Sequence, residues 1–147
     1  MKIQIMKNMA ILGLFFMLAI ASAKAQTPSR VEVNIPFDFA AGKATLKAGA
    51  YSIKRTTGNA LTIRSADGKT TALVNAPLTI GSRDSKAGER LVFNRYGDRY
   101  FLSQVWLTVD TGRQLFISGE ETKVAREFKL ANKNAKPERV EVAVRTR

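Results

Sequence analysis

The chain of 147 residues contains no cysteine and no histidine, and its four methionines all lie at or before Met17. Without cysteine there is no disulfide bond and no thiolate nucleophile. Without histidine as well, the chain cannot form a Ser-His-Asp triad, a zinc site of the usual kind, or a haem site ligated by these side chains. The folded domain must therefore be stabilised by its apolar core, and about 120 residues suffice to build one.

Residues 1–25 have the composition of a secretory signal peptide. Two lysines precede an apolar run from Met9 to Ile20, and small residues ending in Ala23-Lys24-Ala25 follow. The run is shorter than the roughly 20 apolar residues that cross a bilayer, so a cleaved signal is favoured over a membrane anchor. We expect an exported, periplasmic or extracellular protein that begins at Gln26, with cleavage after Ala23 as the alternative, and with no membrane span afterwards.

Residues 26–147 predict a single, mainly β domain. Apolar and polar side chains alternate from Val31 to Phe39, as in a strand with one exposed face, and Pro36 indicates an edge or a bulge there. Further strands are expected at 44–46, 50–55, 61–64 and 70–75, separated by turn signals at a spacing typical of all-β domains. We expect a single antiparallel β-sandwich or small barrel of about seven to eight strands, with one C-terminal helix.

The stretch from Arg90 to Trp106 predicts a β-hairpin around which the domain is organised. Gly97-Asp98 suits a tight turn whose first residue has a positive φ angle. The stretch contains the only tryptophan and several other aromatic residues, so it should bury a large apolar area. We expect a structural core that contains Phe37, Phe93, Phe101 and Trp106; the alternative is that these residues line an internal pocket for an apolar ligand.

The C-terminal part predicts a helix and then a last strand. Ser118 and Glu121 match a capping box, and Val124 and Phe128 share one helical face with Ala131, so we expect a helix over about residues 119–133. Alternating valines predict a strand over residues 139–145.

Both ends of the domain contain the pattern Arg-Val-Glu-Val, at residues 30–33 and 139–142. One interpretation is that the two terminal strands pair and close the sheet, with arginine and glutamate side chains crossing between them. The other is a chance similarity between two short basic strands.

Four motifs resemble those of a group of small, secreted, functionally uncharacterised proteins of soil bacteria. They are Asn34–Phe39, Leu46–Tyr51, Ile63–Gly68 and Leu91–Asp98. The resemblance covers about residues 31–121 and implies export and an all-β domain. It implies no activity, ligand or catalytic residue, and the tail after the helix departs from the group's pattern.

The tip of the predicted hairpin is the candidate ligand-binding site. Arg95, Tyr96, Arg99 and Tyr100 place two guanidinium groups and two phenols near one turn. Such a set can hold an acidic sugar or a phosphate, since arginine makes forked contacts and tyrosine stacks. The alternative is that arginine and tyrosine side chains cover each other on a solvated strand end.

The sequence predicts no catalytic residue, no metal site and no cofactor. Asp38, Asp67 and Asp98 lie at or near turns, and a carboxylate-based hydrolase would need two such groups to converge across a cleft. Calcium would need several oxygen ligands close together, and no aspartate-rich loop of that spacing occurs.

The remaining global feature is a basic excess, with 24 lysines and arginines against 12 acids. Cleavage of residues 1–25 would remove three lysines and no acidic residue, and would lower the net charge from +12 to +9. The cations of the first half include Lys43, Lys47, Lys54, Arg55 and Arg64, and those of the last third include Arg113, Lys123, Arg126, Lys129, Lys133, Lys136, Arg139, Arg145 and Arg147.

This charge has two interpretations: a solvated surface that keeps the protein soluble, or a binding surface for polyanions. We expect a non-enzymatic domain that binds anionic polysaccharide or lipid headgroups, and no nucleic acid because the protein is exported. The alternative is a structural subunit that captures a protein partner through strand edges at Val31 to Phe39 or Val140 to Val144.

Overall fold

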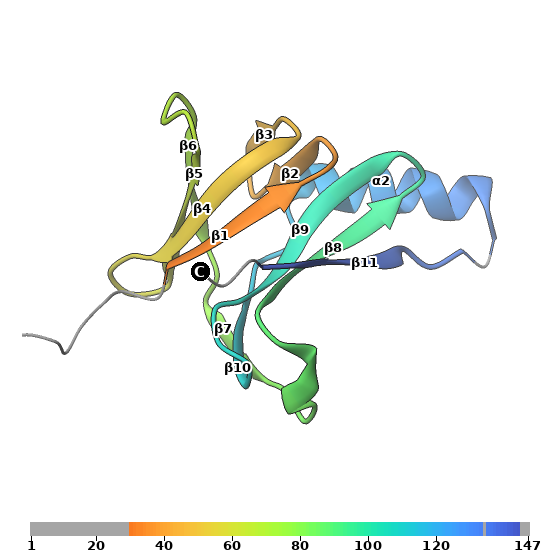
Figure 1. Ribbon diagram of the computed structural model, residues 1–147. Helices are drawn as coiled ribbons and strands as arrows, with labels where there is room; N and C mark the ends of the chain where they lie inside the picture. Colours follow the sequence, from red (N-terminus) through yellow and green to blue (C-terminus); the bar gives the residue numbers. More distant parts are fainter. Residues whose placement is uncertain (1–29, 134, 145–147) are drawn as a thin grey trace, which may run out of the picture.

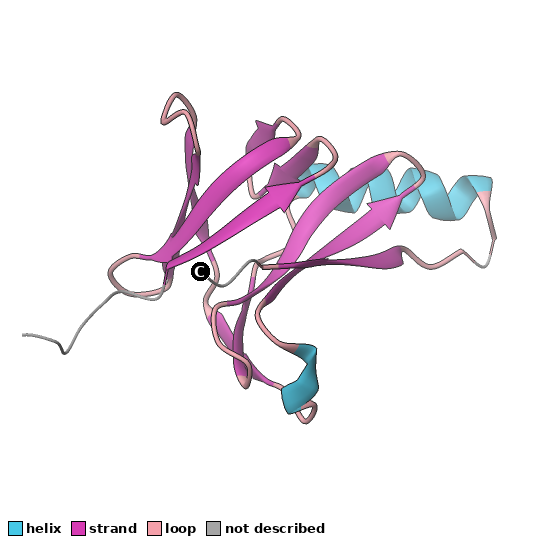
Figure 2. Cartoon of the chain, viewed as in Figure 1, coloured by secondary structure: helices cyan, strands magenta, loops and turns pink. Residues whose placement is uncertain are grey.

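The computed structural model describes residues 30–133 and 135–144, which form eleven strands, a short 3-10 helix and one α-helix (Figure 1). The predicted signal peptide lies outside these residues. The strands form two sheets, so the expected mainly β class is confirmed (Figure 2). None of the helices described in the structure is long and apolar enough to cross a membrane.

The first sheet, sheet A, has four antiparallel strands in the order β1-β4-β5-β6. Their bounds are β1 Arg30–Ile35, β4 Gly49–Arg55, β5 Ala60–Ser65 and β6 Thr71–Asn75. Buried and exposed residues alternate along β1, because inward side chains face the core and outward ones face solvent.

The second sheet, sheet B, has the strand order β11-β8-β9-β10-β7. The bounds are β7 Leu78–Gly81, β8 Arg90–Tyr96, β9 Arg99–Trp106, β10 Thr111–Gln114 and β11 Glu138–Ala143. Gly97 has φ +64°, as the predicted tight turn between β8 and β9 requires.

Two short strands, β2 Phe39–Ala41 and β3 Ala44–Leu46, extend sheet B beside β9, where Ala40 pairs in parallel with Phe101. The predicted long first strand is therefore divided between the two sheets, and it breaks at Pro36, which cannot donate to a ladder. The short strands β7 and β10 were not predicted. Each has only four residues and lies next to turn-forming residues, so the alternation of apolar and polar side chains is too short to recognise.

Both sheets pack against one apolar core, which makes the fold a sandwich. Ile35, Ile53 and Ile63 from sheet A meet Phe93 and Val105 from sheet B, and all five are fully buried. At about 25 cal/mol per Å² of buried apolar area, this shared interior is the main source of stability in a chain without disulfides.

The helix α2, Gly119–Ala131, packs on the opposite face of sheet B, where Val124 and Phe128 contact Tyr96 and Phe101. A short 3-10 helix, η2, spans Ser85–Ala87 in the predicted exposed loop. The helix ends two residues before the expected limit. The last strand spans Glu138–Ala143, whereas residues 139–145 were expected, and residue 145 lies outside the described residues.

The two terminal strands do not pair with each other. β1 pairs with β4, and β11 pairs with β8. The shared pattern instead gives the same contact within each strand: Arg30 lies 3.8 Å from Glu32, and Arg139 lies 3.4 Å from Glu141. Side chains two residues apart on a strand share a face, which explains both ion pairs.

Candidate functional site

The structure divides the four hairpin-tip residues between the two faces of the hairpin. Arg95 pairs with Tyr100 in the ladder, and Tyr96 pairs with Arg99. Because successive side chains on a strand point to opposite faces, Arg95 and Tyr100 lie on one face and Tyr96 and Arg99 on the other. The four residues therefore form two pairs and not one ligand-binding cluster.

Each of the two arginines at the tip already has a carboxylate partner. Arg95 lies over the Tyr100 ring at 5.4 Å and contacts Glu138 of β11 at 3.1 Å. Arg99 pairs with Glu120 of α2. These two ion pairs connect the tip of the hairpin to β11 and to α2.

Tyr96 belongs to a buried polar contact below the helix. Its hydroxyl donates to Glu121 Oε1 at 3.3 Å, and the Asn94 side-chain amide donates to the same oxygen at 2.8 Å. Burial, and then the Glu121 carboxylate, raise the pKa of Tyr96 above its usual range. Glu121 is 4% exposed, so this contact positions the helix and offers nothing to solvent.

The four predicted core residues lie in three different environments. Phe93 is central to the main core, with Phe37 packed edge-on against it at 5.1 Å between ring centroids. Phe101 lies in the cluster beneath α2. Trp106 is 3% exposed but lies outside both clusters, with the Arg90 guanidinium 4.4 Å above its ring.

Two of the three aspartates named as hydrolase candidates serve turns. Asp38 accepts from Lys47 Nζ and from the Ala48 amide, both at 2.8 Å, and these bonds lower its pKa. Asp67 accepts from Ser65 Oγ, which, followed by the Lys69 amide, lowers its pKa. Within residues 30–133 and 135–144, no three acidic side chains gather as a metal site.

A hollow lies on the outer face of sheet A and has a volume of about 890 Å³. It crosses all four strands and extends onto the turn after β5. The side chains around this groove are mostly polar, and they include Arg30, Glu32, Asn34, Ser52, Lys54, Thr62, Arg64, Ser65, Asp67 and Thr71. The polar and charged side chains of this hollow offer hydrogen-bonding and ionic groups to a hydrated ligand.

The register of sheet A brings three cations together in this groove. Arg30 on β1 lies directly opposite Lys54 on β4, and Lys54 lies opposite Thr62, two residues before Arg64 on β5. Directly opposed residues have Cβ atoms about 5 Å apart and diagonal ones about 7–8 Å apart, and like charges at such positions repel. We name this set, Arg30, Lys54 and Arg64, the groove cations.

Only one of the groove cations is neutralised. Arg30 is 3.8 Å from Glu32, whereas Lys54 and Arg64 have no carboxylate within 4.0 Å among the residues that the structure describes. The Arg64 guanidinium packs over the turn at Gly68, where a Cβ atom would lie only 2.9 Å from Nη2. This glycine therefore leaves room for the guanidinium at the rim of the groove.

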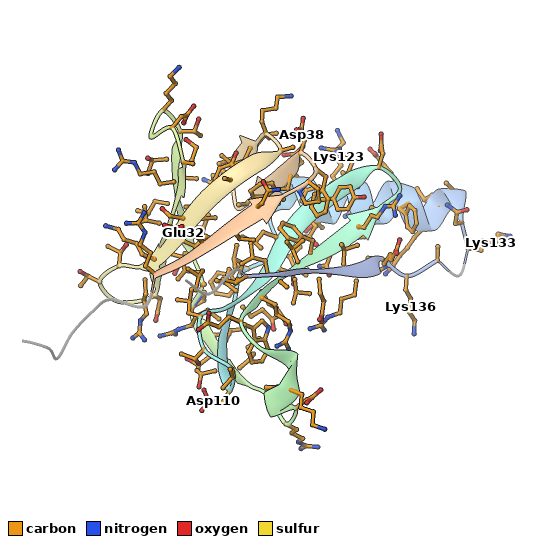
Figure 3. All side chains as sticks on the ribbon, viewed as in Figure 1. Glu32, Asp38, Asp110, Lys123, Lys133 and Lys136 are labelled. Carbon is orange, nitrogen blue, oxygen red and sulfur yellow. The ribbon has the colours of Figure 1, made fainter. Side chains whose placement is uncertain are left out.

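The basic residues of the C-terminal third lie elsewhere. Figure 3 shows Glu32 of the groove at one side of the molecule and Lys133 and Lys136 at the other, beyond the end of α2. Lys133 and Lys136 are therefore remote from the groove, whereas Arg30, Lys54 and Arg64 line it.

Sequence reasoning counted Lys54 and Arg64 among the basic residues but did not group them with Arg30. The alternation of side chains along each strand predicts that these three cations point outward, but it does not predict that they lie close together. Their proximity depends on which strands pair and in which register, which period-two alternation does not encode.

Comparison of the chain with protein-family models, with curated proteins and with solved structures finds no match.

Proposed function

We propose that this protein is an exported, non-enzymatic β-domain that binds an acidic polysaccharide in the groove on sheet A. The observation that carries the proposal is the set of groove cations around a hollow of about 890 Å³. Two of them are opposed across adjacent strands and two lack a carboxylate partner among the described residues. An anion bound between them would relieve their mutual repulsion.

The neutral and acidic neighbours of these cations favour a sugar polymer. Asn34, Ser52 and Thr62 offer hydrogen-bonding groups that match sugar hydroxyls. Glu32 and Asp67 also line the groove, so a densely charged polymer would meet repulsion there. A polymer with sparse carboxylates and hydroxyls between them fits this mixture, whereas a flat membrane surface cannot enter a hollow.

The residues also support export and the absence of catalysis as parts of this proposal. The leader has the order of a signal peptide, which would bring the domain to envelope or extracellular polysaccharides. The lack of histidine and cysteine removes the commonest acid–base and nucleophilic groups.

The test measures binding of the mature protein to hyaluronan, a polymer with a carboxylate on every second sugar, by calorimetry over a range of salt concentrations. We expect binding that weakens as salt rises, because exposed charges are screened within about 8–10 Å at physiological ionic strength. The variant Lys54→Gln/Arg64→Gln should lose about tenfold or more in affinity, as charge-assisted bonds to the polymer are removed.

The control removes two charges outside the groove, in Lys43→Gln/Lys129→Gln, and should change the affinity less than about twofold at the same salt. If both variants weaken binding equally, attraction is non-specific and the groove is not the site. If neutralising Lys129, Lys133 and Lys136 abolishes binding, the surface lies at the C-terminal end.

Neutral dextran and vesicles with anionic headgroups complete the panel. Retention on the vesicles alone would replace the polysaccharide with a lipid surface and overturn the proposal. Absence of binding to every polyanion at low salt would do so as well.

A further inference from the structure

We propose that two copies of this protein pair through the free edge of β6, so that their A sheets join into one. The sequence around this strand is unusual for a basic chain. The 13 residues from Thr70 to Ser82 contain no charged side chain, although 24% of the whole sequence is charged. β6 lies within this segment, as Thr71–Asn75.

The strand stands at the end of sheet A. It pairs with β5 on one side, and on the other side no described strand is hydrogen-bonded to it. Figure 1 shows β6 at the side of the molecule away from α2. At its midpoint, Leu73 is 70% exposed on the outer face. The edge thus offers unpaired backbone groups beside an exposed apolar side chain.

The other edges described in the structure are protected. Charged residues occupy β1, at Arg30 and Glu32, and β11, which has three of them. β3 has three residues, and β7 has four and follows Pro77. Charges, short length and proline are the means by which proteins prevent edge pairing, and β6 has no charge and no proline along five residues.

A second copy of the same strand is the partner that matches this edge best. An antiparallel pair about a two-fold axis at Leu73 places Leu73 against its own counterpart and Thr71 against Asn75. Each exposed leucine then loses water contact. Since both copies carry a large positive charge, the uncharged edge is also where their mutual repulsion is small.

Pairing at β6 would bring the two sheet A grooves onto one continuous face, because Thr71 of β6 borders each groove. A long polymer could then bind both at once and gain avidity. This last consequence rests on the proposed function, whereas the pairing itself does not.

The first experiment measures molar mass by light scattering during gel filtration, over a range of concentrations. The wild-type protein should approach the mass of a dimer as concentration rises. Leu73→Lys places a charge at the centre of the edge and should give a monomer at every concentration. The control Leu130→Lys alters a helix residue that is 78% exposed, and should behave as wild type.

The second experiment tests the register, and it uses the absence of any native cysteine. Leu73→Cys should oxidise to a covalent dimer, since directly opposed Cβ atoms lie within reach of a disulfide. Thr71→Cys and Asn75→Cys should each remain uncrosslinked alone and form a covalent heterodimer when mixed. Circular dichroism checks that each variant is folded.

A wild-type protein that stays monomeric at all concentrations overturns the inference. A folded Leu73→Cys variant that does not crosslink overturns the register. Lys54→Gln/Arg64→Gln should still dimerise, and Leu73→Lys should still bind a short hyaluronan oligosaccharide. These two variants therefore separate a failure of the pairing from a failure of the proposed function.

Discussion

Trp106 shows how one side chain is buried without belonging to the main core. The Arg90 guanidinium covers one side of its ring, and its indole Nε1 donates to Gln104 at 3.2 Å. On the neighbouring strand, a Cβ atom at Gly112 would lie 2.6 Å from the ring. Only glycine leaves room for the indole there, so Gly112 and Trp106 depend on each other.

We expect Trp106→Ala to lower the free energy of unfolding by about 3–5 kcal/mol, because the large buried ring leaves a cavity. That is a large part of the roughly 5–15 kcal/mol that stabilises a domain. Urea denaturation followed by circular dichroism measures it. Phe116→Ala is the control, since that ring is 61% exposed, and it should cost less than about 0.5 kcal/mol. Equal effects of both changes would show that Trp106 is not a packing residue.

Tyr96 should make stability depend on pH in the alkaline range. Burial and the Glu121 carboxylate raise its pKa in the folded state, so the unfolded chain releases this proton at a lower pH than the folded one. The stabilisation is complete below the ordinary tyrosine pKa of about 10 and is lost as pH rises through the folded-state value.

We therefore expect Tyr96→Phe to be less stable than wild type at pH 8, by about 1 kcal/mol for the lost hydrogen bond. The difference should shrink or reverse at a pH well above 10, since phenylalanine does not ionise. Urea midpoints of both proteins across this range measure it. A difference that stays constant with pH would contradict the role given to Tyr96.

At the scale of elements, hydrogen bonds at the first turn of α2 join the helix to sheet B, in addition to the packing of Val124 and Phe128. Ser118 Oγ accepts from the Glu121 amide at 3.1 Å, which is the first half of a capping box. In a full capping box the glutamate side chain would accept from the Ser118 amide. Here the Glu121 carboxylate accepts instead from the side chains of Asn94 and Tyr96 on β8. One residue thus joins the helix start to the sheet.

Ser118→Ala should lower the free energy of unfolding by about 1 kcal/mol, because an orphan amide at the helix start loses its acceptor. Ser118→Asp should keep most of the stability, since aspartate also caps and its charge suits the helix N-terminus. Urea denaturation of the three proteins measures both changes. If the alanine and aspartate variants were equally destabilised, the serine would act through something other than its cap.

At the scale of the whole molecule, the two sheets have different surroundings on their outer faces. Sheet B is covered by α2 near Tyr96 and Phe101, whereas the outer face of sheet A contains the groove. Both proposals therefore concern sheet A: the groove cations on its face and the uncharged β6 at its edge. A ligand and a second copy would use adjacent but separate surfaces.

Much of the fold could be predicted from local patterns. Alternation located most strands, Gly97 marked the hairpin turn, and Ser118 marked the helix start. The carboxylate partner of Arg95 could not be predicted in this way, because Arg95 and Glu138 lie 43 residues apart and meet only when β11 pairs with β8.

The environment of Trp106 depends on a bulge that local patterns did not reveal. In the ladder, Val92 pairs with Gln104 and Phe93 with Leu102, so Ser103 is the extra residue on β9. A bulge shifts the alternation by one residue, and it therefore places Trp106 on the same face as Phe101 instead of the opposite one.

The sequence by itself determined the fold class and the outward direction of Arg30, Lys54 and Arg64, because side-chain alternation along a strand is a local property. Only the tertiary structure decided that these cations share one groove and that β6 ends its sheet. Strand order and register arise from contacts between residues far apart in the chain, and those contacts are chosen by how the whole core packs.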